Sequence, residues 1–261
     1  MGSHWRLVTY QSLILRWKFR NTTERWVQMV SRKFTHTSIP QGVEYTEPTV
    51  QNIHGSRMYS NGTGVYHSIS FILKVLATDH DSLDRWRKRV GEDIAKKTLH
   101  DAIQRGNLFH KICESYLKNE CTCQFENNLL VYSMFQNVKS ELNKIDNIMA
   151  MEFPMISEKY GFAGKLDVLA EYNGVLSIID FKSSRTKKKE VYCKKWFLQE
   201  AAYSLLVEDV LGKPVGQLVT ISAAEDGTVE VFVKHRDEFL DEINFILDEF
   251  RKVHPECEVC K

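Results

Sequence analysis

The sequence predicts an α/β fold in which a β-sheet is flanked by helices. Asn173-Gly174 stands between two apolar runs and indicates a tight β-hairpin, because a two-residue type I′ turn requires positive φ at both central positions. A second hairpin is predicted around residues 225–227, between QLVTIS and VEVFVKH. The chain continues through 237–253 with apolar residues at helical spacing, which predicts an amphipathic helix.

Length and composition limit how many domains the chain can form. The 261 residues are 43% hydrophobic and 26% charged, which is enough to bury one sizeable core. The formal net charge of +1 excludes a globally basic nucleic-acid binder. No stretch approaches the roughly 20 consecutive apolar residues of a transmembrane helix. We expect a basic N-terminal extension over 1–45, one domain over 46–253 and a cysteine-containing tail over 254–261.

The start of the chain differs in charge from the rest. The first 43 residues hold seven Lys or Arg and one acid, Glu24. Apolar residues at helical spacing predict a basic amphipathic helix over 7–20. Such a segment is typical of a mitochondrial targeting sequence or of a DNA-stacking arm. A third hypothesis, which we favour, places the natural start at Met29 and makes 1–28 an extension.

The other elements follow from composition and spacing. Residues 38–64 are rich in Thr, Gly, Asn and Pro, which predicts an extended lead-in. Apolar residues recur at helical spacing in the predicted helices, which cover 68–76, 82–106, 108–118, 125–148 and 194–211. The run MEFPMIS, which contains Glu152, predicts a strand just before the first hairpin.

The register of the first hairpin brings charged residues together. Extended outward from the turn, it places Asp167 directly opposite Asp180, with Cβ atoms about 5 Å apart, where two carboxylates repel unless a cation neutralises them. Lys182 lies two residues beyond Asp180 and emerges on the same face. Carboxylates suit Mg²⁺ or Mn²⁺, which can activate water and stabilise charge on a scissile phosphate. The alternative is an ordinary hairpin in which Lys182 pairs with Asp180 and Asp167 is solvated.

Three further side chains fit such a site. Gln199 and Tyr203 are four residues apart in a predicted helix and project from one face. His110 lies beside the apolar face of another helix, where a histidine is otherwise commonly a satisfied core residue.

Together these motifs resemble, in order and spacing, the series of the RecB-like branch of the PD-(D/E)xK nucleases. The matching motifs are Gly106-x-x-x-His110, Glu152, Gly164-x-x-Asp167, Asp180-Phe181-Lys182 and Gln199-x-x-x-Tyr203. The resemblance covers most of 46–252. It extends to the exonucleases of tailed phages and, more distantly, to mitochondrial genome maintenance exonucleases. It implies a restriction-endonuclease-like core with a mixed β-sheet flanked by helices, preceded by an N-terminal helical region.

The resemblance also implies a role for each residue. The residues implied to bind Mg²⁺ or Mn²⁺ are His110, Asp167, Asp180 and, through its carbonyl, Phe181. Those implied in catalysis are Asp167, Asp180, Lys182, Gln199 and Tyr203, with Glu152 in support. Two departures occur: Ser183 follows the lysine where relatives often have Thr, which keeps the hydroxyl, and His67 stands where relatives often have Pro.

Cations crowd the segment after Lys182, where a phosphate backbone would lie. The predicted DNA-binding residues there are Ser183, Ser184, Arg185, Lys187, Lys188, Lys189, Lys194 and Lys195. Such a run is otherwise a solvated face. Trp196 and Phe197 follow and could stack on unpaired bases, although aromatics at the start of an apolar helix are commonly core.

Four cysteines form two close pairs, Cys121-x-Cys123 and Cys257-x-x-Cys260. Some RecB-like nucleases hold an iron-sulfur cluster, but the terminal trio of ligands in that group is absent here. Zinc is a further alternative for the terminal pair. We expect reduced thiols in an intracellular protein.

These observations predict a metal-dependent DNA exonuclease that prefers single-stranded DNA and acts in replication, recombination or repair. The alternatives are a structure-specific endonuclease, a catalytically inactive DNA-binding protein of the same fold, and an assembly protein that uses the basic N-terminal segment. We expect the protein in the cytoplasm of a bacterial host if it is phage-encoded, with the mitochondrial matrix as the alternative.

Overall fold

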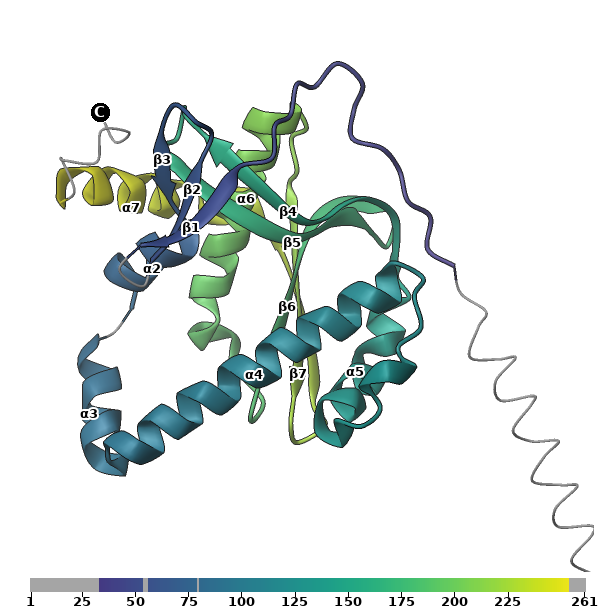
Figure 1. Cartoon of the computed structure of the whole chain (residues 1–261), viewed down its shortest axis with the longest axis vertical. Coiled ribbons are helices and arrows are strands. Elements are labelled where there is room, and N and C mark those ends of the chain that lie inside the picture. Colours follow the sequence, from purple (N-terminus) through teal and green to yellow (C-terminus); the bar gives the residue numbers. More distant parts are fainter. Residues whose placement is uncertain (1–32, 54–55, 79, 254–261) are drawn as a thin grey trace, which may run out of the picture. The chain divides into compact units, whose positions relative to one another are not determined.

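A five-stranded mixed β-sheet forms the centre of the computed structural model, which describes residues 33–53, 56–78 and 80–253 (Figure 1). The strand order is β4-β5-β6-β7-β8. Strands β6 and β7 are parallel, and the other neighbours are antiparallel. The strands are β4 (Ile145–Ser157), β5 (Phe162–Tyr172), β6 (Val175–Ser184), β7 (Gln217–Ala224) and β8 (Val229–His235).

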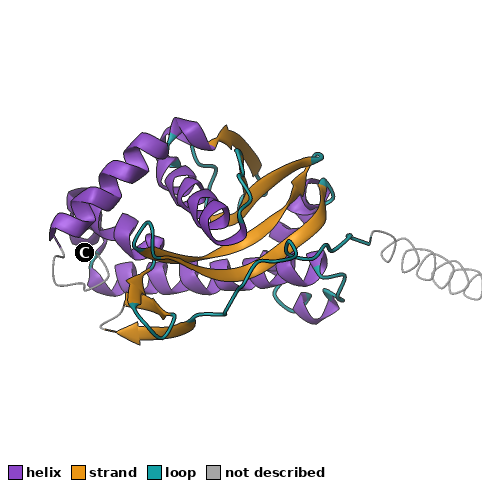
Figure 2. Cartoon of the chain, turned by 90° about the horizontal axis from the view of Figure 1, so that it is seen from above, coloured by secondary structure: helices purple, strands orange, loops and turns teal. Residues whose placement is uncertain are grey.

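Helices cover both faces of this sheet, as Figure 2 shows. One face packs against α2 (Ile69–Leu76), α6 (Lys194–Leu211) and α7 (Leu240–Val253). The other face packs against α4 (Glu92–Leu117) and α5 (Leu129–Leu142), and α4 crosses the sheet obliquely in Figure 1. Because successive strand residues point to opposite faces, Ile178 joins the α6 core and Ile179 the α4–α5 core. The expected mixed sheet flanked by helices is confirmed.

Both predicted hairpins form. Asn173 and Gly174 have φ values of 52° and 79°, as a type I′ turn requires. Tyr172 pairs with Val175, and the predicted register holds for five pairs, out to Val168 with Ile179. Strands β7 and β8 form the second hairpin.

Tertiary packing changes the region before the nuclease motifs. The expected extended lead-in instead contains a three-stranded sheet of β1 (Thr49–Ile53), β2 (Ser56–Ser60) and β3 (Val65–His67). Its Tyr59 and Tyr66 are buried against Ala163 of β5. The apolar contact that stabilises this small sheet is therefore about a hundred residues away along the chain, beyond the reach of local sequence patterns.

Three predicted helix boundaries are wrong. A short helix, α3 (His80–Val90), ends before Gly91, whose φ of 88° interrupts the helical path. Helix α4 then runs unbroken through Gly106, where two helices were expected. Helix α5 begins at Leu129 and ends at Leu142, inside the expected span of 125–148, because Ile145 already starts β4.

Residues 34–45, predicted to belong with the N-terminal extension, pack on the domain that follows them. Phe34 is buried and meets Tyr116 edge to face, with ring centroids 5.2 Å apart. The hydroxyl of Tyr45 donates to the carbonyl of Pro154 at 2.7 Å. The predicted helix over 7–20 and the proposed start at Met29 lie outside the described residues. Within 33–53, 56–78 and 80–253, no helix has the length and hydrophobicity needed to cross a membrane.

A disulfide joins Cys121 to Cys123. The expectation of reduced thiols is wrong for this pair, because two residues with one residue between them come close enough to bond. Cys113 and Cys193 are free and buried. Oxidised sulfurs are not thiolate ligands, so the disulfide form of this pair does not ligate a cluster. Cys257 and Cys260 lie outside the described residues.

Candidate metal centre and active site

The site begins where β5 and β6 separate. Their ladder ends at Val168 with Ile179, because β5 continues along β4 while β6 continues along β7. Asp167 and Asp180 are therefore not a ladder pair, and the expectation that they lie directly opposite one another is wrong. Oδ2 of Asp167 instead accepts a hydrogen bond from the backbone N–H of Phe181 at 2.9 Å. This bond holds the carboxylate in the gap between the two strands.

Asp167 belongs to a group of three potential metal ligands. Nδ1 of His110, on α4, lies 3.1 Å from Oδ2 of Asp167. Among the described residues, one donor atom each of His110, Glu152 and Asp167 lie within 4.8 Å of one another, and all three residues are half-buried. A nitrogen and two carboxylates form a donor set that fits a divalent cation. Asp180, expected as a ligand, is not part of this group of side chains, whereas Glu152 is. The carbonyl of Phe181 stays a predicted ligand.

The backbone of Glu152 is unusual. Its φ of 48° is left-handed, which is uncommon for a residue other than glycine. Its neighbours Met151 and Phe153 keep one continuous register with β5, pairing with Val168 and Leu166. The gap between those pairs lies opposite Asp167. Strained residues of this kind cluster at functional sites, where the surrounding structure enforces them. The carboxylate of Glu152 also contacts the ammonium of Lys165.

The charges of this group shift each other's pKa values. Burial alone lowers the pKa of His110, but the Asp167 carboxylate outweighs burial and raises it to about 9. Burial alone raises the pKa of Asp167, yet His110, Lys182 and the N–H of Phe181 lower it overall. In the absence of a metal, the imidazolium of His110 therefore neutralises Asp167.

Asp180 and Lys182 form a second, deeper pair. Nζ of Lys182 lies 2.5 Å from Oδ2 of Asp180, although the contact lacks hydrogen-bond geometry. Burial raises the pKa of Asp180 despite the ammonium beside it. Burial opposes the charge on Lys182 as well, but Asp180 and Asp167 hold its pKa above the ordinary value. The lysine therefore stays charged.

Helix α6 supplies the neighbours of Lys182. Oε1 of Gln199 accepts from Nζ of Lys182 at 3.4 Å, and Nε2 of Gln199 donates to the hydroxyl of Tyr203 at 2.7 Å. The next residue, Glu200, is fully buried and accepts from the hydroxyl of Thr220 on β7. Burial and the nearby Asp180 raise the pKa of Glu200 well above the ordinary value. The helical spacing of Gln199 and Tyr203 predicted their shared face, but no motif indicated Glu200.

Three residues of the expected DNA-binding loop already make contacts within the protein. Ser184 is buried, and its hydroxyl donates to the carbonyl of Thr186. Oγ of Ser183 accepts from Arg105 at 3.3 Å. Lys194 pairs with Glu242 at 2.6 Å.

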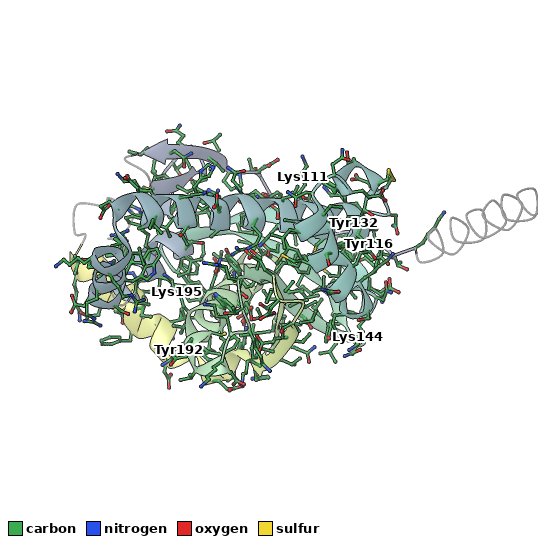
Figure 3. All side chains as sticks on the ribbon, turned by 90° about the horizontal axis from the view of Figure 1, so that it is seen from below. Lys111, Tyr116, Tyr132, Lys144, Tyr192 and Lys195 are labelled. Carbon is green, nitrogen blue, oxygen red and sulfur yellow. A yellow bond between two sulfur atoms is a disulfide. The ribbon has the colours of Figure 1, made fainter. Side chains whose placement is uncertain are left out.

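Other cations of the loop remain exposed. Arg185, Lys188 and Lys189 are exposed and make no ion pair in the described part of the chain. Lys187 lies 4.0 Å from Glu230. Nζ of Lys195 donates to Oγ1 of Thr78 at 2.8 Å, at the start of α6 (Figure 3). Of the two aromatics that could stack on bases or belong to the core, Phe197 is buried core and Trp196 is partly buried against that core.

Comparison with known proteins points to exonucleases. No family model matches the sequence. The chain is 32% identical over 111 residues to human mitochondrial genome maintenance exonuclease 1, and 29% identical over 110 residues to the mouse protein. Each match covers 41% of this chain and 32% of the relative, so the chain spans about a third of the length of the curated relatives it matches.

One solved structure is also similar. It is a candidate exonuclease from Eubacterium rectale, with 16% identity and a TM-score of 0.40, and the match covers 56% of this chain and 64% of that one.

Proposed function

We propose that the chain is a metal-dependent DNA exonuclease of the RecB-like PD-(D/E)xK class that hydrolyses phosphodiester bonds. The observation that carries the proposal is the group formed by His110, Glu152 and Asp167, with the charged Lys182 close enough to affect the pKa of two of its members. A metal-ligand group beside a buried ammonium suits phosphoryl chemistry, in which negative charge develops on the phosphate.

His110, Glu152 and Asp167 would hold Mg²⁺ or Mn²⁺, with Asp180 and the carbonyl of Phe181 as further ligands expected from the family. When bound, the ion would lower the pKa of a water and stabilise charge on the scissile phosphate. The N–H of Phe181 orients Asp167 for this role, because it fixes one oxygen of the carboxylate.

Lys182 would act as the catalytic ammonium. Asp180 keeps it charged despite burial, and Gln199 fixes the direction of Nζ. The hydroxyl of Tyr203 accepts a hydrogen bond from the amide of Gln199 and holds that amide in place. Tyr203 therefore positions Lys182 indirectly, through Gln199. A fixed ammonium stabilises a phosphate oxygen better than a mobile one, because little reorganisation is needed during reaction.

DNA as the substrate is supported by the names of the mitochondrial relatives and by the exposed cations Arg185, Lys188 and Lys189 next to β6. We further propose that the enzyme prefers single-stranded DNA and acts in replication, recombination or repair. An intracellular location follows from that role. The phage-type resemblance favours a bacterial host, and the mitochondrial relatives favour the mitochondrial matrix.

The test compares Lys182→Ala with Lys213→Ala, a lysine that follows α6 and lies outside the site. Wild type and Lys213→Ala should degrade end-labelled single-stranded DNA with Mg²⁺ or Mn²⁺ and not with EDTA. Lys182→Ala should lose at least a hundredfold of this activity while its circular dichroism spectrum and unfolding curve stay those of a folded protein. Equal degradation by Lys182→Ala would overturn the mechanism.

A closed circular single strand separates exonuclease from endonuclease activity. The proposal expects the linear strand to disappear and the circle to survive. Cleavage of the circle would favour a structure-specific endonuclease. Tight DNA binding without hydrolysis of either substrate would favour an inactive DNA-binding protein.

A further inference from the structure

A polar cavity of about 560 Å³ lies beside the candidate metal centre, between the small sheet, α2 and the start of β5. Its lining combines three cations with hydroxyl groups and contains no Asp or Glu. The residues that matter for its chemistry are Arg57, Ser70, Lys74, Lys165 and Tyr203. A cavity of this size is typical of small-ligand sites.

Two lining residues connect the cavity to the active site. Ser70 and Tyr203 both contact Nε2 of Gln199, at 3.4 Å and 2.7 Å, and Gln199 contacts Lys182. A third lining residue, Lys165, contacts the candidate metal ligand Glu152. A molecule in the cavity would therefore lie next to the reacting phosphate.

The cations at the mouth of the cavity lack counter-charges. Arg57 and Lys74 are exposed and make no ion pair within the described residues. Lys74 also lies close to Lys195. Burial and the charge of Lys74 together lower the pKa of Lys195. Like charges that gather repel one another, and an anion that binds among them relieves the repulsion.

We propose that this cavity holds one unpaired nucleotide of the substrate strand next to the scissile bond, with its phosphate bound by Arg57 and Lys74. The inference rests on the proposed nuclease function and adds to it a binding site for one nucleotide of the strand. A guanidinium and an ammonium are the groups that proteins commonly place on phosphates. The hydroxyl groups of the lining can donate to phosphate or sugar oxygens.

The cavity also accounts for a preference for single strands. A base-paired nucleotide would have to leave its stack and its partner to enter such a cavity, which costs free energy that an unpaired nucleotide does not pay. A frayed end or a single strand enters without that cost.

The test measures binding without cleavage. The full chain is titrated in EDTA against a short fluorescein-labelled oligothymidylate and a blunt duplex of equal length, at several salt concentrations, by fluorescence anisotropy. Wild type should bind the single strand at least tenfold more tightly than the duplex. Arg57→Gln/Lys74→Gln should lose about tenfold in affinity for the single strand, with its salt slope reduced by about 0.7, since the two side chains share one phosphate contact and each such contact contributes about 0.7.

The matched control is Lys144→Gln/Lys213→Gln, which removes two charges at the other end of the sheet. The backbone carbonyl of Lys144 accepts from the N–H of Asn173 in the β5–β6 turn, far along β5 from Gly164. This control should bind the single strand as wild type does. Unfolding curves of Arg57→Gln/Lys74→Gln should match wild type, because both side chains are exposed. The control loses the surface ion pair of Lys144 with Glu141, which contributes little stability, so it should also stay folded.

The outcomes separate this inference from the proposed function. Wild-type affinity and salt slope in Arg57→Gln/Lys74→Gln would overturn the inference, even if the protein degrades DNA. Equal affinity of wild type for single strand and duplex would overturn it as well. Specific loss of single-strand binding in that variant supports the cavity site, even if wild type hydrolyses nothing, in which case the nuclease proposal alone fails. Absence of binding to either DNA would overturn the inference, while degradation of DNA with Mg²⁺ or Mn²⁺ decides the nuclease proposal separately.

Discussion

Gly164 and Tyr203 are in such close contact that no side chain fits between them. A Cβ atom on Gly164 would lie 2.6 Å from Cε1 of Tyr203 and 3.3 Å from Cδ1 of Leu206. Glycine at this point of β5 therefore lets α6 approach the sheet closely, and that approach brings Gln199 of α6 to Lys182 of β6. The glycine of the Gly164-x-x-Asp167 motif thus has a packing role that is separate from metal binding.

Gly164→Ala should destabilise the fold by about 1–3 kcal/mol, because the ring and the helix must move to admit the methyl group. Displacement of Tyr203 and Gln199 should also lower nuclease activity by roughly tenfold to a hundredfold. Urea unfolding and initial rates on single-stranded DNA measure the two effects.

Gly106→Ala is the control for that substitution. Its Cβ would lie 3.6 Å from Oγ of Ser183, an ordinary contact, and alanine favours the interior of α4 by up to about 1 kcal/mol. Its stability should equal or exceed that of wild type. If Gly164→Ala behaves like Gly106→Ala, the close packing of α6 on β5 is not what the glycine provides.

Glu152→Gln should weaken Mn²⁺ binding by roughly tenfold or more, because one of three convergent donors loses its charge. Isothermal titration of the metal into each protein measures this. Glu171→Gln is the matched control, since Glu171 lies nearer the turn on β5 and contacts Asn147. Undiminished binding in Glu152→Gln together with lost binding in Asp180→Asn would instead favour the ligand set expected from the sequence.

His110 should titrate near pH 9 in the metal-free protein. Because the pKa is raised in the folded state, the pair with Asp167 stabilises the fold fully below about pH 6.5, the ordinary value for histidine, and this stabilisation is lost as pH rises through about 9. A metal-binding imidazole must be neutral, so metal affinity should rise with pH over the same range.

An NMR titration of the His110 ring in EDTA checks this pKa. Asp167→Asn should lower it, since the carboxylate is the main source of the rise. A wild-type value near 6.5 would contradict the proposed ion pair.

Glu200→Gln should remove a pH-dependent loss of stability. The pKa of Glu200 is raised in the fold, so the protonated form is favoured there and the wild type loses stability as pH rises above about 4.3, the value of an unperturbed glutamate. Glutamine has the same shape and keeps an acceptor for the hydroxyl of Thr220. The variant should therefore gain stability relative to wild type between pH 4.5 and 8 in urea unfolding series. A difference that stays constant with pH would show that Glu200 does not titrate in this range.

Lys188→Ala/Lys189→Ala should weaken DNA binding and reduce the salt slope for single strands by about 1.4, because each lysine would release one phosphate contact. Lys194→Ala should have a smaller effect, since Lys194 already pairs with Glu242. Anisotropy titrations in EDTA at several salt concentrations compare the variants. If the double variant and Lys194→Ala weaken DNA binding equally, the loop attracts DNA through its overall positive charge and not through particular lysines.

Local sequence signals predicted the parts of the fold whose determinants lie close together in the chain. The Asn173-Gly174 turn sets the β5–β6 register through backbone dihedral angles within two residues, and the helical spacing of Gln199 and Tyr203 sets their shared face. The small sheet that contains Arg57 could not be predicted in this way, because its tyrosines depend on burial against Ala163.

The sequence by itself determined which chemical groups the site would contain and that a tight hairpin would carry Asp167 and Asp180. Only the tertiary structure decided that these two carboxylates would belong to different charged groups. Backbone hydrogen bonding commits β5 to β4 and β6 to β7 beyond Val168 and Ile179, so the two strands separate at the carboxylates. Asp167 is left to join His110 of α4 and Glu152 of β4, whereas Asp180 pairs with Lys182 of its own strand.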